Sequence, residues 1–298
     1  MRTVAGAAFD RVRPAGTRPM ALLQRGLVYL GAAFAALVLV GIVGYICVMG
    51  IPELKPSLLE WEYNSNNVSL VPALVNTLLM ALLALLIAVP VGVGSAIYLV
   101  EYAPRASRFV KLVRITAETL QGIPSIIYGL FGALFFVGVC KMGLSLLSGA
   151  CTLAIMVLPV IMRTTEEALL AVPDAYRQGG YGLGAGRVRT VFRCVLPSAM
   201  PGILGGVILA LGRCVGEVAA LIFTAGSIAA IPNFVAEGPA AVLDSARTLA
   251  VHMYVLSSEG LHIGETYATA VVLLVLVLLI NLATTATARR MNKGVQSD

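Results

Sequence analysis

The chain has 298 residues, of which 59% are hydrophobic and only 12% carry a charge. Its mean hydropathy is +0.92. These values lie far outside the range of soluble globular domains, so they indicate that lipid is the main solvent. The net charge of +6 does not indicate a nucleic-acid binder, because the basic residues lie in short clusters between long apolar runs and do not gather with aromatic residues.

Six uncharged runs are long enough, or nearly so, to cross a membrane as helices. A hydrocarbon core of about 30 Å requires roughly 20 apolar helical residues, and a helix satisfies its own backbone groups in lipid whereas an open strand does not. In chain order the runs cover residues 26–50, 70–100, 119–140, 142–162, 195–212 and 267–288. The sequence therefore predicts an all-α polytopic protein with six transmembrane helices. The first run is too long for a secretory signal and is predicted to stay as a helix.

The Lys and Arg residues of the connecting segments predict the orientation. Lys55, Lys141 and Arg247 lie on one side of the six runs, Arg213 follows the fifth run, and the remaining 17 of the 21 basic residues lie on the other side. Basic residues accumulate in cytoplasmic loops. We therefore expect a multi-pass protein of the cell inner (plasma) membrane with both termini in the cytoplasm.

Composition also divides the chain into parts. Residues 1–20, rich in Arg, Gly and Pro, are predicted to be a disordered cytoplasmic arm. The parts that follow are a first helix with an outer loop at 21–69, the main membrane domain at 70–290, and a cytoplasmic tail at 291–298. Within the main domain, the outer segment at 227–264 carries an amphipathic stretch near 242–254. We expect a short helix there, lying along the outer face.

The inner loop at 174–197 carries the first functional pattern. The chain has no G-x-x-x-x-G-K-[ST] phosphate-binding loop, so any ATP that it uses must be hydrolysed by another subunit. The loop reads D-A-Y-R-Q-G-G-Y-G-L-G, nine residues, then C-V-L-P. It resembles the cytoplasmic coupling loop of ABC importer permeases, E-A-A-x3-G-x9-I-x-L-P. The resemblance implies that a short helix docks on an ATPase through Asp174, Arg177, Gln178, Gly179, Gly180, Gly184, Leu196 and Pro197. Gly184 is expected to turn the chain out of that helix.

The glycines of this loop predict a weak helix. Gly179 and Gly180 stand where the family pattern has alanines, and with Gly182 they cost a helix roughly 3 kcal/mol in total. We expect the helix to be poorly formed until it docks, and we expect alanine at Gly179 and Gly180 to tighten ATPase binding. A plain glycine-rich loop is the alternative.

A wider resemblance extends from about residue 76 onward. The segments that carry it are Q-G-I-P-S-I-I-Y-G at 121–129, L-P-V-I-M-R-T-T-E-E-A at 158–168, L-A-L-G-R-C-V-G-E at 209–217, F-T-A-G at 223–226 and S-A-R-T-L-A-V-H-M-Y at 245–254. Together they resemble the PstA family of phosphate permeases, within the binding-protein-dependent transport system inner-membrane components. The resemblance implies the type I, MetI-like permease fold.

Arg213 and Glu217 are the predicted substrate-pathway pair. If the fifth helix starts near Pro201, a rise of 1.5 Å per residue puts Arg213 about 18 Å along it, near the bilayer middle, with Glu217 one turn further on the same face. Ionisable groups at that depth are costly and often mark solute pathways. A guanidinium offers paired donors to phosphate oxygens, and the resemblance places both residues on the translocation path. A purely structural ion pair is the alternative.

Other residues carry weaker signals. Pro124 and Ser125 are predicted to break the third helix and expose backbone amides to an anion, or to form a kink tolerated for packing. Arg163, Glu166 and Glu167 end the fourth run and are expected to form ion pairs at the inner surface, with gating as a possible role. His252 and His262 are expected at the surface rather than in a metal site. The cysteines, including Cys140 and Cys151, are expected to fill apolar positions.

The sequence as a whole predicts a membrane-spanning permease subunit of an ATP-driven phosphate importer. It is expected to be neither an enzyme nor a cofactor- or metal-binding protein, with ATP and Mg used by the partner ATPase. The resemblance implies a second, PstC-like permease, two PstB-like ATP-binding subunits and a PstS-like phosphate-binding protein on the outer face. A permease for another oxyanion such as molybdate or sulfate, an ion-gradient transporter and a signalling subunit that reports phosphate are the alternatives.

Overall fold

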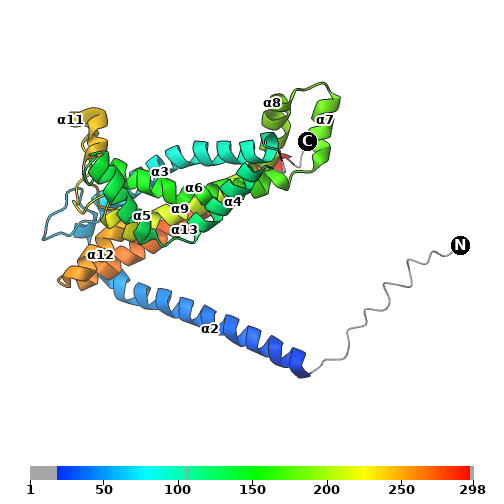
Figure 1. Ribbon diagram of the computed structural model, residues 1–298. Helices are drawn as coiled ribbons and strands as arrows, with labels where there is room; N and C mark the ends of the chain where they lie inside the picture. The colour runs from blue at the N-terminus through cyan, green and yellow to red at the C-terminus, as the bar shows by residue number, and fades with distance from the viewer. Residues whose placement is uncertain (1–18, 105–106, 296–298) are drawn as a thin grey trace. The chain divides into compact units, whose positions relative to one another are not determined.

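The computed structural model describes residues 19–104 and 107–295, and most of that range is helical (Figure 1). The predicted arm at 1–20 lies almost wholly outside the described residues, as does the end of the predicted tail at 291–298. The main helices are α2 (Pro19–Gly50), α3 (Val71–Ile97), α4 (Arg108–Gln121), α5 (Ser125–Gly132), α6 (Leu146–Leu170), α7 (Asp174–Gly182), α9 (Leu196–Val215), α12 (Leu249–Glu259) and α13 (Ile263–Val295). The four-residue helices α8 (Arg187–Thr190), α10 (Ala219–Ile222) and α11 (Phe234–Glu237) lie between them.

Several of these helices continue through a short turn of different pitch. The π segments are η3 (Tyr98–Tyr102) after α3, η4 (Ala133–Val139) after α5, and η5 (Val191–Val195) between α8 and α9. The 3-10 segments are η1 (Ile51–Glu53), η2 (Pro56–Leu59) and η6 (Gly238–Leu243). As a result, the fifth predicted span is one apolar helical stretch from Arg187 to Val215.

The prediction of six membrane spans is confirmed, with one change. Five helical stretches in the described residues are long and apolar enough to cross a membrane, and a sixth span arises if α4 and α5 are counted together. These two helices meet at an angle of 102°, so the third span is a broken pair that begins at Arg108, before the run predicted at 119–140. The bend lies at Gly122 and Pro124, where proline has no amide hydrogen and disfavours helical conformation in the residue before it.

The chain forms two compact units, residues 1–49 and 50–298. The first unit contains nearly all of α2, which carries Gln24 and Arg25 near its start and is apolar around its whole circumference from Gly26 onward. A helix without a polar face is typical of a lipid-embedded segment. The mean hydropathy of its span, 2.6, is the highest among the candidate spans.

The core of the second unit is built by α3, α6 and α9, with α13 packed against α9 (Figure 1). Small residues allow these helices to approach closely, as is usual in membranes, where apolar burial from water does not drive helix association. A Cβ atom at Gly92 would lie 2.9 Å from Ile161 on α6, and one at Gly206 would overlap Thr164. Tight packing of α6 between α3 and α9 therefore depends on glycine.

The two ends of this bundle differ. We call the end that carries α7 and α8 the coupling end, and the end that carries α11 and α12 the distal end (Figure 1). At the distal end, Asn76 of α3 donates hydrogen bonds to the carbonyls of Ala230 and Arg247 and so ties the predicted outer segment to the bundle. The short helix expected near 242–254 is present as α12, shifted to Leu249–Glu259. Thr248 fixes its start by accepting a hydrogen bond from the Val251 amide.

His252 corrects one expectation, because it is fully buried rather than at the surface. Its ring meets Tyr63 edge-on, and its Nδ1 lies 3.4 Å from Nη1 of Arg247. Burial, assisted by the positive charge of Arg247, lowers the pKa of His252 to about 4. His252 is therefore neutral at physiological pH. His262 is only partly buried, and its Nδ1 lies 3.8 Å from Glu265.

Candidate coupling and translocation sites

The inner loop contains a complete helix, α7 (Asp174–Gly182), so the alternative of a plain glycine-rich loop is wrong. Gly184 follows the helix with a φ of +76°. The Gly184 amide donates to the Tyr181 carbonyl at 2.9 Å, and the Ala185 amide donates to the Gly180 carbonyl at 3.0 Å. This pair of bonds is a Schellman motif, which satisfies the last carbonyls of a helix. The predicted turn at Gly184 is therefore present.

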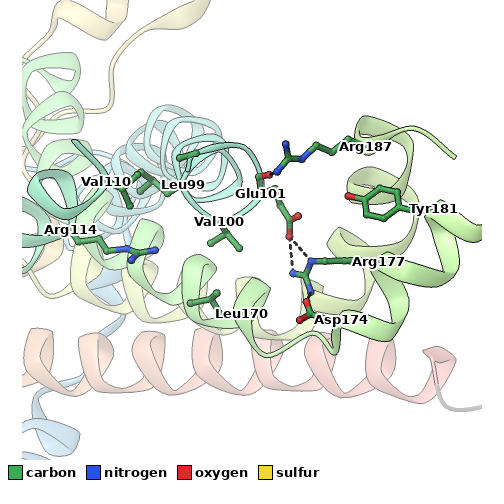
Figure 2. Close-up of a pocket in the computed structure, with 11 residues that line it drawn as sticks. Leu99, Val100, Glu101, Val110, Arg114, Leu170, Asp174, Arg177, Tyr181 and Arg187 are labelled. Atoms are coloured by element: carbon green, nitrogen blue, oxygen red, sulfur yellow. Dashed lines mark hydrogen bonds and ion pairs between the residues drawn. The ribbon is translucent and has the colours of Figure 1, made fainter. Parts of the chain in front are cut away.

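Arg177 attaches α7 to the rest of the bundle (Figure 2). Its Nη2 lies 2.7 Å from Oε1 of Glu101 on η3, and its Nε donates to the same oxygen at 3.1 Å. Nη2 also donates to the carbonyl of Leu169 and Nη1 to that of Val172, at 2.9 and 2.8 Å. A fifth, longer contact of 3.3 Å joins Nη1 to Asp174. The five contacts can therefore provide a hydrogen-bond acceptor for each of the five N–H groups of this guanidinium.

Glu101 is the functional candidate that sequence reasoning missed. Its side chain is only 5% exposed, although it directly follows the long apolar run at 70–100. A carboxylate at that position does not by itself indicate a functional residue, since many membrane spans end in a charged residue. Its partner Arg177 lies 76 residues further along the chain, and no local pattern pairs the two.

A second arginine meets the same residues from α8. Arg187 donates to the backbone carbonyl of Glu101, and its guanidinium carbon lies 5.2 Å from the ring centre of Tyr102. Figure 2 shows Arg177 and Arg187 on either side of Glu101. They line a cavity of about 470 Å³, with Arg114 and Tyr181 also in its wall. Arg177 of α7 and Arg187 at the start of α8 thus both hold the α7–α8 segment to η3, at the end of α3.

The glycines of α7 are not equivalent. A Cβ atom at Gly180 would lie 2.8 Å from Cγ2 and 2.9 Å from Oγ1 of Thr190, which is buried on α8. A Cβ atom at Gly179 or Gly182 would meet nothing within 4 Å. Alanine therefore fits at Gly179 without a clash but would crowd Thr190 at Gly180, where glycine permits α7 and α8 to pack closely, and the tighter ATPase binding expected of the double change stays a prediction.

Leu196 and Pro197 also differ from expectation. They were predicted to close a loop, but they lie within the helical stretch from Arg187 to Val215. Pro197 occupies the first turn of α9, where its missing amide hydrogen costs least. The π segment η5 joins this turn to α8. The connection that follows α7 is therefore short, and helix resumes at Arg187.

The coupling segment presents large apolar side chains to its surroundings. Leu183 is 90% exposed, and Tyr176, Val188 and Phe192 are also exposed. These residues lie on or directly beside α7, α8 and η5. Large apolar side chains that lie exposed within one short segment are typical of a protein interface.

The charged residues at the end of α6 form the expected ion pairs. Arg163 contacts Glu167 at 2.7 Å and Glu118 of α4 at 2.6 Å, and Glu166 contacts Arg114 of α4 at 2.6 Å. The α4 partners were not identified from the sequence, because residues before 119 were assigned to a loop. The pairs with Glu118 and Arg114 link α4 to α6. Nothing else in the described residues bears on a gating role.

Arg213 and Glu217 do not pair as predicted. Helix α9 ends at Val215, so Glu217 lies beyond it and its Oε1 accepts a hydrogen bond from the Ala220 amide at 3.3 Å. Gly216 is a weak helix former, and a side chain that bonds a nearby amide competes with the helix. The ion pairs of the described residues include none between Arg213 and Glu217. The same-face prediction was therefore wrong.

Arg213 instead lies near the break between α4 and α5. It is within electrostatic range of Tyr128, whose hydroxyl donates to the Leu120 carbonyl at 2.7 Å. At the same level, Gln121 donates to the carbonyl of Pro159, roughly 20 Å along the 25-residue helix α6. The depth count from Pro201 used the wrong helix start, but this neighbourhood still places Arg213 near the middle of the bundle.

Pro124 and Ser125 lie at that same break. Pro124 precedes α5 with extended backbone angles, and Ser125 is the first residue of the helix. The predicted helix break is therefore present, as a bend of 102°. The first amides of a helix lack intrahelical partners.

In the part of the chain that the structure describes, a bundle of apolar spans carries an arginine near its middle and a short helix anchored at one end, an arrangement typical of a polytopic membrane protein. In the described residues, no three His, Cys, Asp or Glu side chains gather as a metal site. Residues 88–293 match the family described as binding-protein-dependent transport system inner membrane components. The chain belongs to this family. It is therefore a multi-pass permease subunit of an ABC importer, in which ATP is hydrolysed by a partner ATPase.

Individual relatives agree with this assignment. The chain is 35% identical over 278 residues to the probable ABC transporter permease protein YqgI of Bacillus subtilis, covering 88% of this chain and 92% of that one. It is 35% identical over 211 residues to the phosphate transport system permease protein PstA 1 of Mycobacterium tuberculosis, covering 71% and 67%.

Solved importers share the fold. A bacterial alginate ABC transporter matches with a TM-score of 0.61 at 16% identity, covering 92% of this chain and 99% of the matched chain. The inward-facing MetNI methionine transporter matches with a TM-score of 0.57 at 22% identity, covering 74% and 93%. These likenesses confirm the predicted MetI-like permease fold.

Proposed function

We propose that the chain is the PstA-like permease of a phosphate importer and that Arg213 contacts phosphate on the translocation path. The observation that carries the proposal is a guanidinium near the middle of the bundle, beside a broken helix, with no ion pair among the described residues. An unpaired charge at that depth is costly unless a passing anion compensates it. The similarity to PstA 1 supports phosphate as that anion.

The roles of the neighbouring residues follow from the same placement. Pro124 and Ser125 start α5 at the level of Arg213, and the first amides of a helix attract anions. Glu217 accepts a hydrogen bond from the Ala220 amide in the first turn of α10, so in this proposal it stabilises the backbone beside the path rather than neutralising Arg213. Arg163 and Glu166 tie α6 to α4 through Glu118 and Arg114, and Glu167 holds Arg163 from the next turn of α6. We assign a gating role to these pairs, because breaking them would free α4 to move relative to α6.

The coupling segment serves the ATPase. The exposed apolar residues around Leu183 form the docking surface, and Gly184 sets the direction in which the chain leaves it. The complete importer then contains a second, PstC-like permease, two PstB-like ATP-binding subunits that use ATP and Mg, and a PstS-like binding protein. Both termini and the coupling end face the cytoplasm.

A permease for another tetrahedral oxyanion is the second candidate, because a guanidinium binds sulfate or molybdate with the same paired donors. The complex reconstituted in vesicles with its binding protein separates the two. Labelled phosphate should enter in an ATP-dependent manner, and excess sulfate or molybdate should not compete. Competition by either anion at equal concentration would move the substrate assignment to that anion.

The role of Arg213 is tested in the same vesicles. Arg213→Gln should reduce phosphate uptake at least a hundredfold while the complex still assembles and binds ATP. Arg108→Gln is the matched control, since Arg108 is an exposed arginine at the start of α4 and its removal should leave uptake within twofold of the parent. Uptake by Arg213→Gln at the parental rate would exclude Arg213 from the path.

A further inference from the structure

We propose that Glu101 is a positioning residue that locks the coupling helix α7 to the end of α3, so that the two move together when the ATPase moves α7. The inference rests on the proposed coupling role of α7. It assigns a mechanical function to a residue that lies outside the coupling loop and has no role in docking.

The contact has the character of a core interaction rather than a surface ion pair. The side chains of Glu101 and Arg177 are 5% and 15% exposed. By contrast, the other carboxylate partner of Arg177, Asp174, is 68% exposed, and Glu167 in the α6 pair is 60% exposed. Exposed pairs are screened and contribute little, whereas removal of one partner from a buried pair leaves an uncompensated charge. Glu101 is therefore the partner that fixes Arg177.

Arg177 connects three elements through one rigid group. Its guanidinium contacts the Glu101 carboxylate on η3 and the carbonyls of Leu169 and Val172 at the end of α6. The Leu169 carbonyl lies in the last turn of α6, where a carbonyl lacks its usual i+4 amide partner, and otherwise accepts the longer bond of 3.4 Å from the Val172 amide. Because the guanidinium is planar, its donors fix orientation as well as distance. α7 is thus held to both α3 and α6.

Arg187 supplies a second point of attachment. It reaches the backbone carbonyl of Glu101 and lies over the ring of Tyr102. Arg177 lies inside α7 and Arg187 begins α8, so residues 101–102 are held from both sides of the turn at Gly184. The α7–α8 segment is therefore attached to η3 at two points, one on each side of its turn.

This arrangement links the coupling helix to the helices that line the path. α3 packs along α6, and both pack against α9, which carries Arg213. A displacement of α7 that is transmitted through Glu101 therefore reaches the bundle as a movement of α3 and α6 together. Without the lock, α7 could follow the ATPase while α3 stays in place.

The test is Glu101→Gln in the complete importer, which retains the size of the side chain and removes its charge. We expect the ATPase to co-purify within twofold of the parent, because the docking surface is unchanged. Solute transported per ATP hydrolysed should fall at least tenfold, and backbone amides of α7 should exchange at least tenfold faster. Glu265→Gln, a carboxylate change at the opposite end of the bundle, should leave all three quantities within twofold.

The double variant Glu101→Gln/Arg177→Gln separates a lock from a merely structural pair. It removes both buried charges, so a purely structural role predicts that coupling recovers. The lock predicts that coupling stays at least tenfold below the parent, because the attachment is still missing. Recovery in the double variant, or normal transport per ATP in Glu101→Gln, would overturn the proposal.

Two further outcomes are also decisive. If Glu101→Gln does not assemble with the ATPase, amide exchange of α7 in the full chain alone decides: faster exchange supports the lock and unchanged exchange overturns it. If the parent complex transports another anion, the phosphate assignment fails, and the lock is then tested with that anion and its binding protein.

Discussion

A pair of adjacent glycines in α7 provides a sensitive test of the packing described above. Gly179 faces open space, whereas a Cβ atom at Gly180 would lie 2.8 Å from Thr190 Cγ2. Alanine at either position makes the same chemical change in the same turn of the same helix. The two variants should nevertheless have opposite effects on the stability of α7, because only one of them meets a buried neighbour.

The magnitudes follow from two terms. Alanine in place of glycine in a helix stabilises it by about 1 kcal/mol, which is a factor of about five in the helix-opening equilibrium. Gly179→Ala should show this gain in full. At Gly180 the same gain is offset by overpacking, which typically costs 1–3 kcal/mol, so Gly180→Ala should be neutral to destabilising by about 2 kcal/mol. The two variants should therefore differ by at least about fivefold.

Amide exchange of residues 174–182 in the full chain measures this difference, and co-purification of the ATPase reports its consequence for docking. Gly179→Ala should slow exchange and retain more ATPase, and Gly180→Ala should do neither. Adding Thr190→Ser to Gly180→Ala removes the Cγ2 methyl group while keeping the hydroxyl that donates to the Gly186 carbonyl, so it should restore part of the protection. Equal protection in the two single variants would refute the reasoning.

Two other regions yield predictions. In a cysteine-free background, a cysteine that replaces exposed Ser257 should react with an impermeant thiol reagent in intact cells. A cysteine that replaces exposed Leu183 should react only after the membrane is opened. The reverse pattern would invert the predicted orientation. The pKa of His252 is about 4 in the folded protein and near 6.5 in the unfolded chain. Acidification below pH 6.5 therefore favours the unfolded chain, and it lowers the free energy of unfolding by about 2 kcal/mol at pH 5. Amide exchange of α12 between pH 7 and pH 5 should show that loss, and the same loss in His252→Gln would assign it to another group.

The spans were predictable because lipid imposes one dominant constraint. Backbone groups must be satisfied within a segment, so an uncharged run of about 20 residues has few alternatives to a helix. The Gly184 turn was predictable for a similar reason, since a glycine after a short helix is typical of a C-terminal cap. In both cases the signal is local, and the structure differs from the prediction mainly at the helix ends.

The incorrect predictions concern the end of α9 and the burial of His252. The bond from the Ala220 amide to Glu217 accompanies the end of α9 at Val215, and an uninterrupted helix with Glu217 one turn beyond Arg213 was equally compatible with the sequence. The ring of buried His252 packs edge-on against Tyr63, which lies far away in the chain. This second contact is set by tertiary packing, so a single sequence cannot reveal it.

Helix α7 shows how a tertiary contact can reverse a local preference. Gly179, Gly180 and Gly182 weaken it by roughly 3 kcal/mol relative to alanine, yet residues 174–182 form a complete helix. The buried pair between Arg177 and Glu101 and the Schellman motif at Gly184 are the contacts that can supply the missing order. We therefore expect the order of α7 to depend on its attachment through Glu101 as well as on its own sequence, so that a change that frees α7 from η3 also loosens the helix.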